Sequence, residues 1–371
     1  MLISNKEFLQ IFDNVENEHP NLYHDISKEG FVKQLNKVAD KVETMDKPKL
    51  TFELCRLFAL FKDGHTRIYE IDEQPFTYKL IAVQDKIYIA GIKKELQSLL
   101  MCPVSRLGGK DISEVVSIGK QLIMAETPQW RQYSLLDRLR YPYFLSALDL
   151  LNDGNELTLT IDDKDYILPY NNNEMVLIPQ FCNQTKQEVK DAGDICYIRF
   201  SSNCEDKNYP FKQVYQDIKR HLSKGKRVVV DLRYNEGGPS TNFDKVVDAL
   251  KDNECVGCCL INEGTFSGGT VDTKRLVNIG FTTIGSSMGQ PVQYYGNSGK
   301  KYDVPQLGLR YRSSISEFNL NSGLKHPMSE QPDVFVENTH TDYVNNVDRV
   351  LQTALDFLQT PLREQCRNKL D

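Results

Sequence analysis

The sequence lacks the features that mark several protein classes. No run approaches the roughly 20 consecutive apolar residues that a membrane-spanning helix needs. Positive charge is not in excess, since 45 Lys and Arg stand against 51 Asp and Glu, for a net charge of −6. A mildly acidic surface repels phosphate backbones. We therefore expect neither a nucleic-acid partner nor a membrane partner.

Paired cysteines and a leader segment are also lacking. The nine cysteines are an odd number scattered along the chain, which argues against a disulfide framework. The N-terminus has no basic segment followed by an apolar stretch, as a secretory signal would have. We expect a cytoplasmic protein, the alternative being a mature secreted form whose signal has been removed.

The tightest cysteine cluster has two interpretations. Cys255, Cys258 and Cys259 could form half of a zinc site, but no second Cys or His pair follows at matching spacing. Cys also behaves as a small hydrophobic residue in buried strands. The buried strand is the interpretation that we favour, and we expect no metal.

The first 67 residues are predicted to be helical. Phe31, Leu35 and Val38 recur at helical spacing behind Ser27, a residue type that caps helix N-termini. A second apolar run over residues 50–61 predicts another helix. We expect Gly64 to end it in the left-handed conformation that glycine adopts easily.

Two further regions follow. Residues 68–170 contain short segments of alternating hydrophobicity, such as 86–90 and 156–161, and a helix that starts at Ser113. Strands and helices alternate after an Asn-rich linker at 170–173, which predicts an α/β layer structure. The predicted parts are a helical region (1–67), a β-rich module (68–170) and an α/β core (171–371).

Two glycine-containing turns in the last region could carry chemistry. Residues 227–232 form an apolar run typical of a strand covered on both faces, and a glycine turn at 235–239 follows it. Backbone amides in such a turn can point at an anion. Ser267 stands between a second apolar run and a helix, where its hydroxyl would be presented at the sheet edge. Alternatively, Ser267 only caps that helix.

A serine nucleophile needs a base. The chain has six histidines, and His65 lies in a short turn directly after a predicted helix. Turns on a rigid scaffold often position functional side chains.

Ordered motifs along the chain resemble the tail-specific (C-terminal processing) serine proteases. An Asp-Gly-His-Thr motif stands at residues 63–66, behind a helical region that contains His19-Pro20. The family's strand and glycine turn are matched at 229–238, and its nucleophile turn at 265–267. Three closing segments follow in the same order, at 284–290, 331–334 and 342–348.

The resemblance implies a fold, an activity and site residues. The α/β core would be of the crotonase-like or Clp-protease-like type, and residues 76–130 would be a degenerate PDZ-like module. Ser267 would attack the carbonyl of a peptide or protein substrate, without a cofactor. Gly238 and Gly268 would donate backbone N–H groups to an oxyanion hole.

The resemblance also bears on the base. Some members of the family use a lysine after the nucleophile's helix, but this chain has Gln290 there and no lysine between Arg275 and Lys300. His65 would take that role, as in the tricorn-like branch of the family.

Departures from the family pattern keep alternatives open. Glu236 replaces a third glycine, and an acid that orients His65 is not evident, so Glu330 is our candidate and Glu317 the second. The chain could be an inactive peptide-binding member.

A third alternative is an α/β-hydrolase esterase. In that fold the histidine follows the nucleophile, so His326 or His340 would be the base.

Overall fold

The computed structural model describes residues 2–72, 74–170, 174–182, 185–322 and 327–359. The chain forms two compact units, one of Met1–Ile178 with Gln293–Phe318 and one of Pro179–Val292 with Asn319–Asp371, called unit 1 and unit 2 below. The predicted division into 1–67, 68–170 and 171–371 differs from these units, because residues 293–318 return to unit 1.

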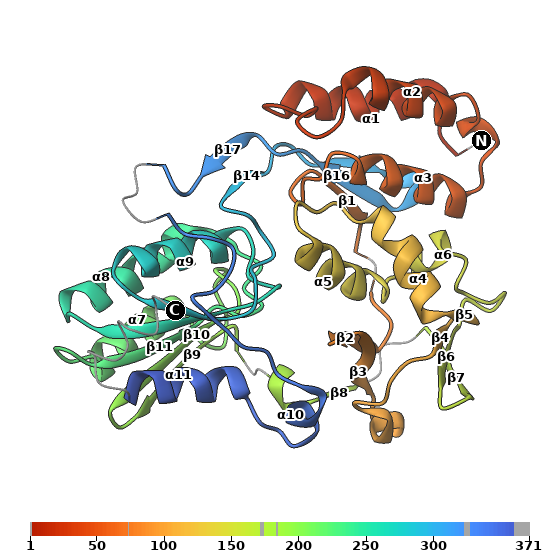
Figure 1. Ribbon diagram of the computed structural model, residues 1–371. Helices are drawn as coiled ribbons and strands as arrows, with labels where there is room; N and C mark the ends of the chain where they lie inside the picture. Colours follow the sequence, from red (N-terminus) through yellow and green to blue (C-terminus); the bar gives the residue numbers. More distant parts are fainter. Residues whose placement is uncertain (1, 73, 171–173, 183–184, 323–326, 360–371) are drawn as a thin grey trace. The chain divides into compact units, whose positions relative to one another are not determined.

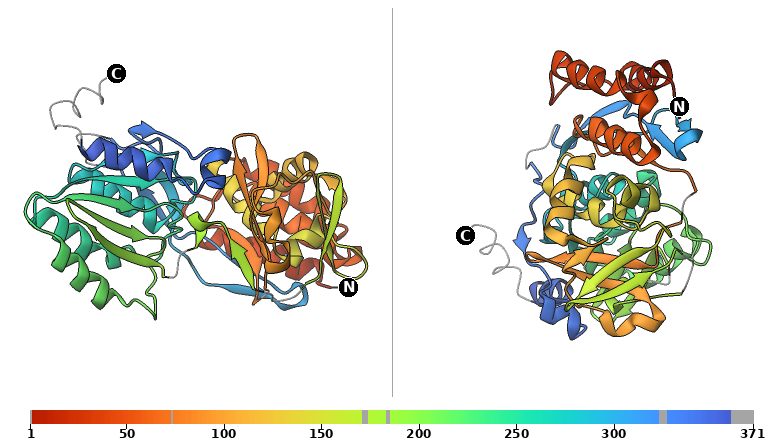
Figure 2. Two further views of the ribbon diagram at one scale, coloured as in Figure 1. Left: turned by 90° about the horizontal axis from the view of Figure 1, so that it is seen from below. Right: turned by 90° about the vertical axis from the view of Figure 1, so that its right-hand side faces the viewer.

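Unit 1 begins with three helices, drawn in red and orange in Figures 1 and 2: α1 (Asn5–Glu18), α2 (Lys28–Ala39) and α3 (Lys47–Ala59). Ser4, Ser27 and Asp46 cap their N-termini by accepting backbone N–H groups. The predicted cap at Ser27 is thus confirmed. The helices pack through buried aromatic rings, those of Phe8, Phe12, Phe31, Phe58 and Phe61.

The end of α3 differs from the expectation. The helix stops at Ala59, and the residue with positive φ after it is Lys62 (φ 46°), not Gly64. Lys62 closes the turn, so the left-handed conformation is used two residues before the predicted glycine. The prediction of a Gly64 cap was wrong.

The rest of unit 1 holds short antiparallel sheets with helices beside them. One sheet has the order β2-β3-β8 and another β5-β4-β6-β7. The strands are β2 (Tyr78–Val83), β3 (Lys86–Lys93), β4 (Arg106–Leu107), β5 (Lys110–Asp111), β6 (Leu157–Ile161), β7 (Lys164–Leu168) and β8 (Met175–Leu177). The helices are α4 (Ile112–Gly119), α5 (Pro128–Arg138) and α6 (Pro142–Ala147), with 3-10 turns η1 (Val42–Thr44), η2 (Lys94–Leu99) and η3 (Lys120–Leu122). Of the expected linker, residues 171–173 lie outside the described part of the chain.

A late segment of the chain completes unit 1. Strand β16 (Leu309–Arg312) pairs antiparallel with β1 (Arg67–Glu70) and with β15 (Tyr302–Val304). Strands β14 (Gln293–Gly296) and β17 (Ser316–Asn319) form a separate pair. A 3-10 turn, η6 (Pro305–Leu307), connects β15 to β16. The β1–β16 pairing explains why this segment belongs to unit 1.

Unit 2 is built on a six-stranded sheet of order β18-β13-β12-β11-β10-β9 (Figure 1). Only the β9–β10 pair is antiparallel among these ladders. The strands are β9 (Gln187–Ala192), β10 (Ile195–Phe200), β11 (Arg227–Asp231), β12 (Val256–Ile261), β13 (Thr282–Gly285) and β18 (Val334–Phe335). The helices are α7 (Phe211–His221), α8 (Asp244–Asp252), α9 (Gly268–Asn278), α10 (His340–Val344) and α11 (Arg349–Gln359), with 3-10 turns η4 (Pro179–Phe181) and η5 (Ser240–Phe243). The predicted α/β class is confirmed.

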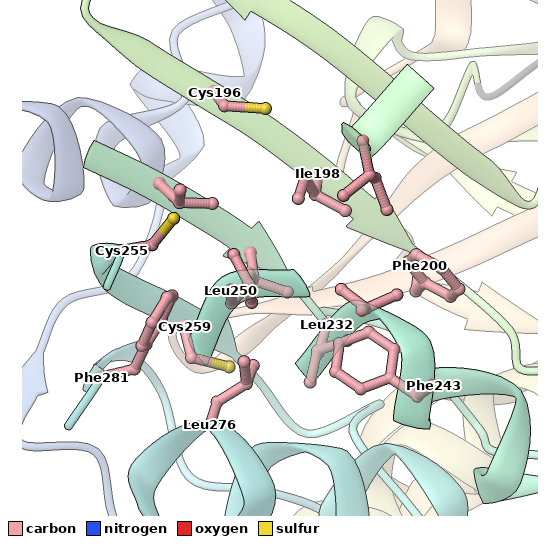
Figure 3. Close-up of a cluster of buried hydrophobic side chains, with 14 of the residues drawn as sticks. Cys196, Ile198, Phe200, Leu232, Phe243, Leu250, Cys255, Cys259, Leu276 and Phe281 are labelled. Carbon is pink, nitrogen blue, oxygen red and sulfur yellow. The ribbon is translucent and has the colours of Figure 1, made fainter. Parts of the chain in front are cut away.

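Both faces of the sheet are covered. Side chains of α7, α8 and α9 pack on one face of the sheet, and those of α11 pack on the other. Figure 3 shows part of the first cluster, with Leu250 of α8 and Leu276 of α9. Neighbouring residues of a strand point to opposite faces, so Cys259 joins the first cluster and Cys258 the second. Their thiols point to opposite faces of a buried strand, so the buried-strand interpretation is confirmed.

Candidate active site

Three consecutive loops meet at the carboxyl edge of the unit 2 sheet. They follow β11, β12 and β13, and backbone hydrogen bonds join them: the N–H of Phe266 donates to the carbonyl of Asn235 at 2.9 Å, and that of Gly289 to Thr265 at 3.1 Å. In α/β sheets, sites form where the carboxyl ends of parallel strands meet. Ser267 lies in the middle loop.

Ser267 has an unusual backbone conformation. Its φ of 53° and ψ of −119° are rare for a residue with a Cβ. Such strain costs about 1–3 kcal/mol and concentrates at functional sites. The residue occupies the N-cap position of α9, yet its side chain makes no capping hydrogen bond. The alternative in which Ser267 only caps the helix therefore has no support.

The glycine turn after β11 lies directly against Ser267. A Cβ added to Gly237 (φ 100°) would lie 2.6 Å from the nitrogen of Gly268 and 2.8 Å from the Cβ of Ser267. A side chain at position 237 would thus collide with the serine turn. Glu236, which replaces the third glycine of the family pattern, is exposed.

Two backbone N–H groups near Ser267 donate no hydrogen bond within the described part of the chain. Among the residues that the structure describes, neither the N–H of Gly238 nor that of Gly268 has a hydrogen-bond partner. Gly238 has φ 123° and is exposed, and Gly268 is the first residue of α9. The N-terminus of α9 carries partial positive charge beside Gly268, and amides in a glycine turn such as that of Gly238 can point at an anion.

Gln290 supports Ser267 from the third loop. Its side-chain Oε1 accepts the backbone N–H of Ser267 at 2.7 Å, and the residue is fully buried. The sequence identified position 290 only as the place where a lysine base is missing. Its contact to the serine backbone could not be read from the sequence.

His65 lies in unit 1, in a turn organised by a buried carboxylate. Asp63 accepts the backbone N–H of His65 at 2.8 Å through Oδ1. Its Oδ2 accepts the Oγ hydroxyl of Ser314 at 2.6 Å and the Nε2–H of His19 at 3.0 Å. The Nδ1 of His19 accepts the N–H of Asn21, which fixes its tautomer. The motif at 63–66 and the His-Pro before it are thus parts of one hydrogen-bonded structure.

The ring of His65 is buried and held on two sides. It stacks on Tyr294 with 6.0 Å between centroids, and a ring N–H donates to the backbone carbonyl of Tyr295. Burial lowers the pKa of His65 to about 4; Asp63 opposes this, while Arg67 and Arg312 add to it. The imidazole is therefore neutral near pH 7, with one nitrogen able to accept a proton.

The buried carboxylate beside His65 keeps its charge. Burial raises the pKa of Asp63. The hydrogen bond from His19, the His65 charge and the Ser314 hydroxyl act in the opposite direction and outweigh burial, so the pKa is lowered to about 2. Asp63 is therefore ionised at neutral pH.

The candidate acids lie in different places. Glu330 belongs to unit 2, where its side chain is half-buried and its backbone carbonyl accepts the N–H of Met288 at 2.9 Å. Glu317 is exposed and bonds to Gln293 at 3.2 Å. Asp63, which the sequence analysis did not name as an acid for His65, is close to its ring.

Asp63, His65 and Glu126 are the described residues that could hold a metal ion, with ligand atoms within 4.8 Å of one another. Two observations disfavour a cation there. Asp63 already accepts three hydrogen bonds, and Arg67 and Arg312 place positive charge beside His65.

His340 opens the short helix α10, and His326 lies outside the described residues. Within the described part of the chain, no helix is long and apolar enough to cross a membrane.

Comparisons with known proteins give a partial family match and a similar fold. Residues 194–259 match the model of peptidase family S41. No curated protein matches the sequence. The solved structure of mature CPAF is 12% identical, with a TM-score of 0.65 over 98% of this chain and 98% of that chain. Mature CPAF complexed with lactacystin is 11% identical, with a TM-score of 0.62 over 96% of this chain and 99% of that one.

The comparisons bear on the predictions in two ways. The match over residues 194–259 agrees with the predicted resemblance to a family of serine peptidases. The structural likeness confirms the fold along nearly the whole chain, and it leaves the α/β-hydrolase alternative without support.

Proposed function

We propose that this chain, which matches the model of peptidase family S41 over residues 194–259, hydrolyses peptide bonds through an acyl-enzyme on Ser267. The observation that carries the proposal is the conformation of Ser267. Its backbone is strained, its side chain does not cap α9, and two amides without acceptors lie in the adjoining turns.

His65 is the proposed base. It takes the proton of the Ser267 hydroxyl as Oγ bonds to the substrate carbonyl carbon. The N–H groups of Gly238 and Gly268 bind the resulting oxyanion, and His65 then gives the proton to the leaving amine as the C–N bond breaks. Water, deprotonated by His65, hydrolyses the acyl-enzyme. The Tyr295 carbonyl supports this proposal because it fixes the tautomer of His65.

Glu330 is the proposed carboxylate that stabilises the imidazolium of His65 during the reaction. Its side chain is half-buried. Replacing Glu330 by Gln would then lower kcat without changing the fold.

The substrate is proposed to be a peptide or protein, which a degenerate PDZ-like module at residues 76–130 would guide to the core. The proposal keeps the three parts 1–67, 68–170 and 171–371, except that residues 293–318 of the last part belong to unit 1. A crotonase-like or Clp-protease-like core fits the layered sheet of unit 2.

Labelling by a fluorophosphonate tests the proposal. We expect one covalent adduct, on Ser267 by peptide mapping, and none in Ser267→Ala. His65→Ala should abolish both labelling and hydrolysis of an activated ester, whereas His340→Ala should leave them unchanged. A correctly folded wild type that takes no label would instead favour the second candidate, an inactive peptide-binding member of the family.

A further inference from the structure

A chain of fully buried polar side chains connects α9 to the glycine turn. Asn203, Asn235 and Asp272 each have 0% of their surface exposed. The Nδ2 of Asn203 donates to Asp272 Oδ2 at 2.7 Å, and the Nδ2 of Asn235 donates to Asn203 Oδ1 at 3.0 Å. All three residues belong to unit 2 and come from three different segments.

Two residues of this side-chain network, Asn203 and Asn235, also hold the backbone groups of Gly237. The backbone N–H of Asn203 donates to the Gly237 carbonyl at 2.9 Å, and the Gly237 N–H donates to Asn235 Oδ1 at 2.9 Å. The Gly237 carbonyl and the Gly238 N–H belong to one planar trans peptide unit, so they point in opposite directions. Holding that carbonyl therefore sets the direction of the Gly238 N–H.

The other end of this side-chain network lies in α9, the helix that follows Ser267. Asp272 lies one turn into α9, and its Oδ1 accepts Arg275 Nη1–H at 3.1 Å. Arg275 also donates to the carbonyl of Ser240 at 2.6 Å. The network thus joins the nucleophile's helix to the glycine turn.

Burying this carboxyl is unfavourable. Burial raises the pKa of Asp272 to about 7, against the lowering effects of Asn203 and Arg275. Burial disfavours the ionised form of a carboxyl, and groups perturbed in this way cluster at functional sites. The hydrogen bonds described above connect Asp272 to the candidate site.

We propose that Asn203 and Asp272 are positioning residues that aim the Gly238 amide at the oxyanion. The inference rests on the proposed function of Ser267 and Gly238. Neither side chain contacts the reacting atoms, so they act through the peptide unit between Gly237 and Gly238. Their effect should fall on the transition state, because the oxyanion exists only there.

An exchange of the two side chains tests the proposal. Asn203→Asp alone places two carboxylates against each other, so we expect kcat to fall about 10- to 100-fold with KM within about twofold. In the double variant Asn203→Asp with Asp272→Asn, Asn at 272 donates to Asp at 203, which still accepts from Asn235. We expect it to recover kcat to within about threefold of the wild type.

A peptide boronate, which mimics the tetrahedral intermediate, gives a second readout. Its inhibition constant should weaken by the same factor as kcat/KM in Asn203→Asp and recover in the double variant. Asp244→Asn is the matched control. Asp244 pairs with the same Arg275 at 3.0 Å but is half-exposed and makes no contact to Asn203 in the described structure. Asp244→Asn should leave both kcat/KM and the boronate inhibition constant unchanged.

The outcomes separate the two proposals. Full activity of Ser267→Ala would overturn the proposed function. If Ser267→Ala is inactive while Asn203→Asp keeps its kcat, only the positioning role is lost. The positioning role is also lost if the double variant is no better than the single one, or if KM changes in place of kcat. Melting temperatures of all variants show whether a loss reflects unfolding.

Discussion

Gln290 Oε1 accepts the backbone N–H of Ser267 at 2.7 Å inside the unit 2 core. The serine's own amide is therefore occupied and is not available to an oxyanion. The donors for a tetrahedral intermediate would then come from Gly238 and Gly268, as the family resemblance implies. At a position where some relatives carry a lysine base, this chain has an acceptor that supports the nucleophile's backbone.

We predict that Gln290→Ala lowers kcat about tenfold or more. The backbone N–H of Ser267 would lose a buried hydrogen bond worth roughly 1 kcal/mol, and the strained turn with positive φ could then relax. Gln290→Lys should be no better, since a lysine ammonium has donors but no acceptor. Steady-state kinetics on a peptide substrate is the measurement. Gln352→Ala on the exposed face of α11 is the control. Lysine at 290 that raises activity above Ala would refute the backbone-support role.

A second prediction uses two glycines of similar conformation. Gly238 (φ 123°) and Gly280 (φ 96°) both adopt backbone angles that strain any other residue. An added Cβ at Gly238 would lie 3.0 Å from Cys204 Sγ, whereas Gly280 has no atom within 4 Å of its added Cβ. Alanine at either position should destabilise the fold by about 1 kcal/mol or more.

Only the variant at Gly238 should lose activity, by about 100-fold in kcat, because its amide is the proposed oxyanion donor. Urea unfolding and kcat, measured on both variants, separate strain from catalysis. Equal activity of the two variants would reduce the Gly238 turn to a structural role.

The third prediction concerns the carboxylate beneath His65. Asp63→Asn replaces one acceptor oxygen with a donor, which must face the N–H of either His19 or His65 or the Ser314 hydroxyl. Breaking a buried charged network costs about 3 kcal/mol, so chemical denaturation should show a loss of that size. Ser314→Ala removes one donor only and should cost about 1 kcal/mol. Equal stability of Asp63→Asn and wild type would mean that the turn does not depend on the charge.

Much of unit 2 could be predicted because its pattern is local. Buried parallel strands are continuous apolar runs, so β11 and β12 are evident from residues 227–231 and 256–261. The serine turn and the glycine turn follow these strands directly, and their motifs have a fixed order.

The parts that could not be predicted depend on contacts between distant segments. The acceptor for the His65 ring is the backbone carbonyl of Tyr295, and a backbone group leaves no trace in residue identity. Pairing of β1 with β16 joins residues more than two hundred positions apart, so the return of this segment to unit 1 was missed. Asn203 and Asp272 are ordinary polar residues in the sequence, and only their burial singles them out.

The last prediction concerns pH. An unperturbed histidine has a pKa of about 6.5. Burial lowers the pKa of His65 to about 4, with Arg67 and Arg312 adding to the effect. A general base must be neutral, so kcat/KM should hold as pH falls through 6.5 and decline only near pH 4. Far-UV circular dichroism at each pH shows whether the protein is still folded.

Stability gives an independent check on His65. Between about pH 6.5 and pH 4 the unfolded chain binds a proton on His65 that the folded chain does not, so His65 destabilises the fold as pH falls through this window. Asp272, whose pKa is raised to about 7, acts with the opposite sign. Asp272 contributes equally to the free energies of unfolding of the wild type and of His65→Gln, so its contribution cancels in their difference. We expect the free energy of unfolding of the wild type, relative to His65→Gln, to fall by about 1.4 kcal/mol per pH unit across the window. A difference that stays constant with pH, together with an activity limb near pH 6.5, would show that His65 is solvated and unperturbed.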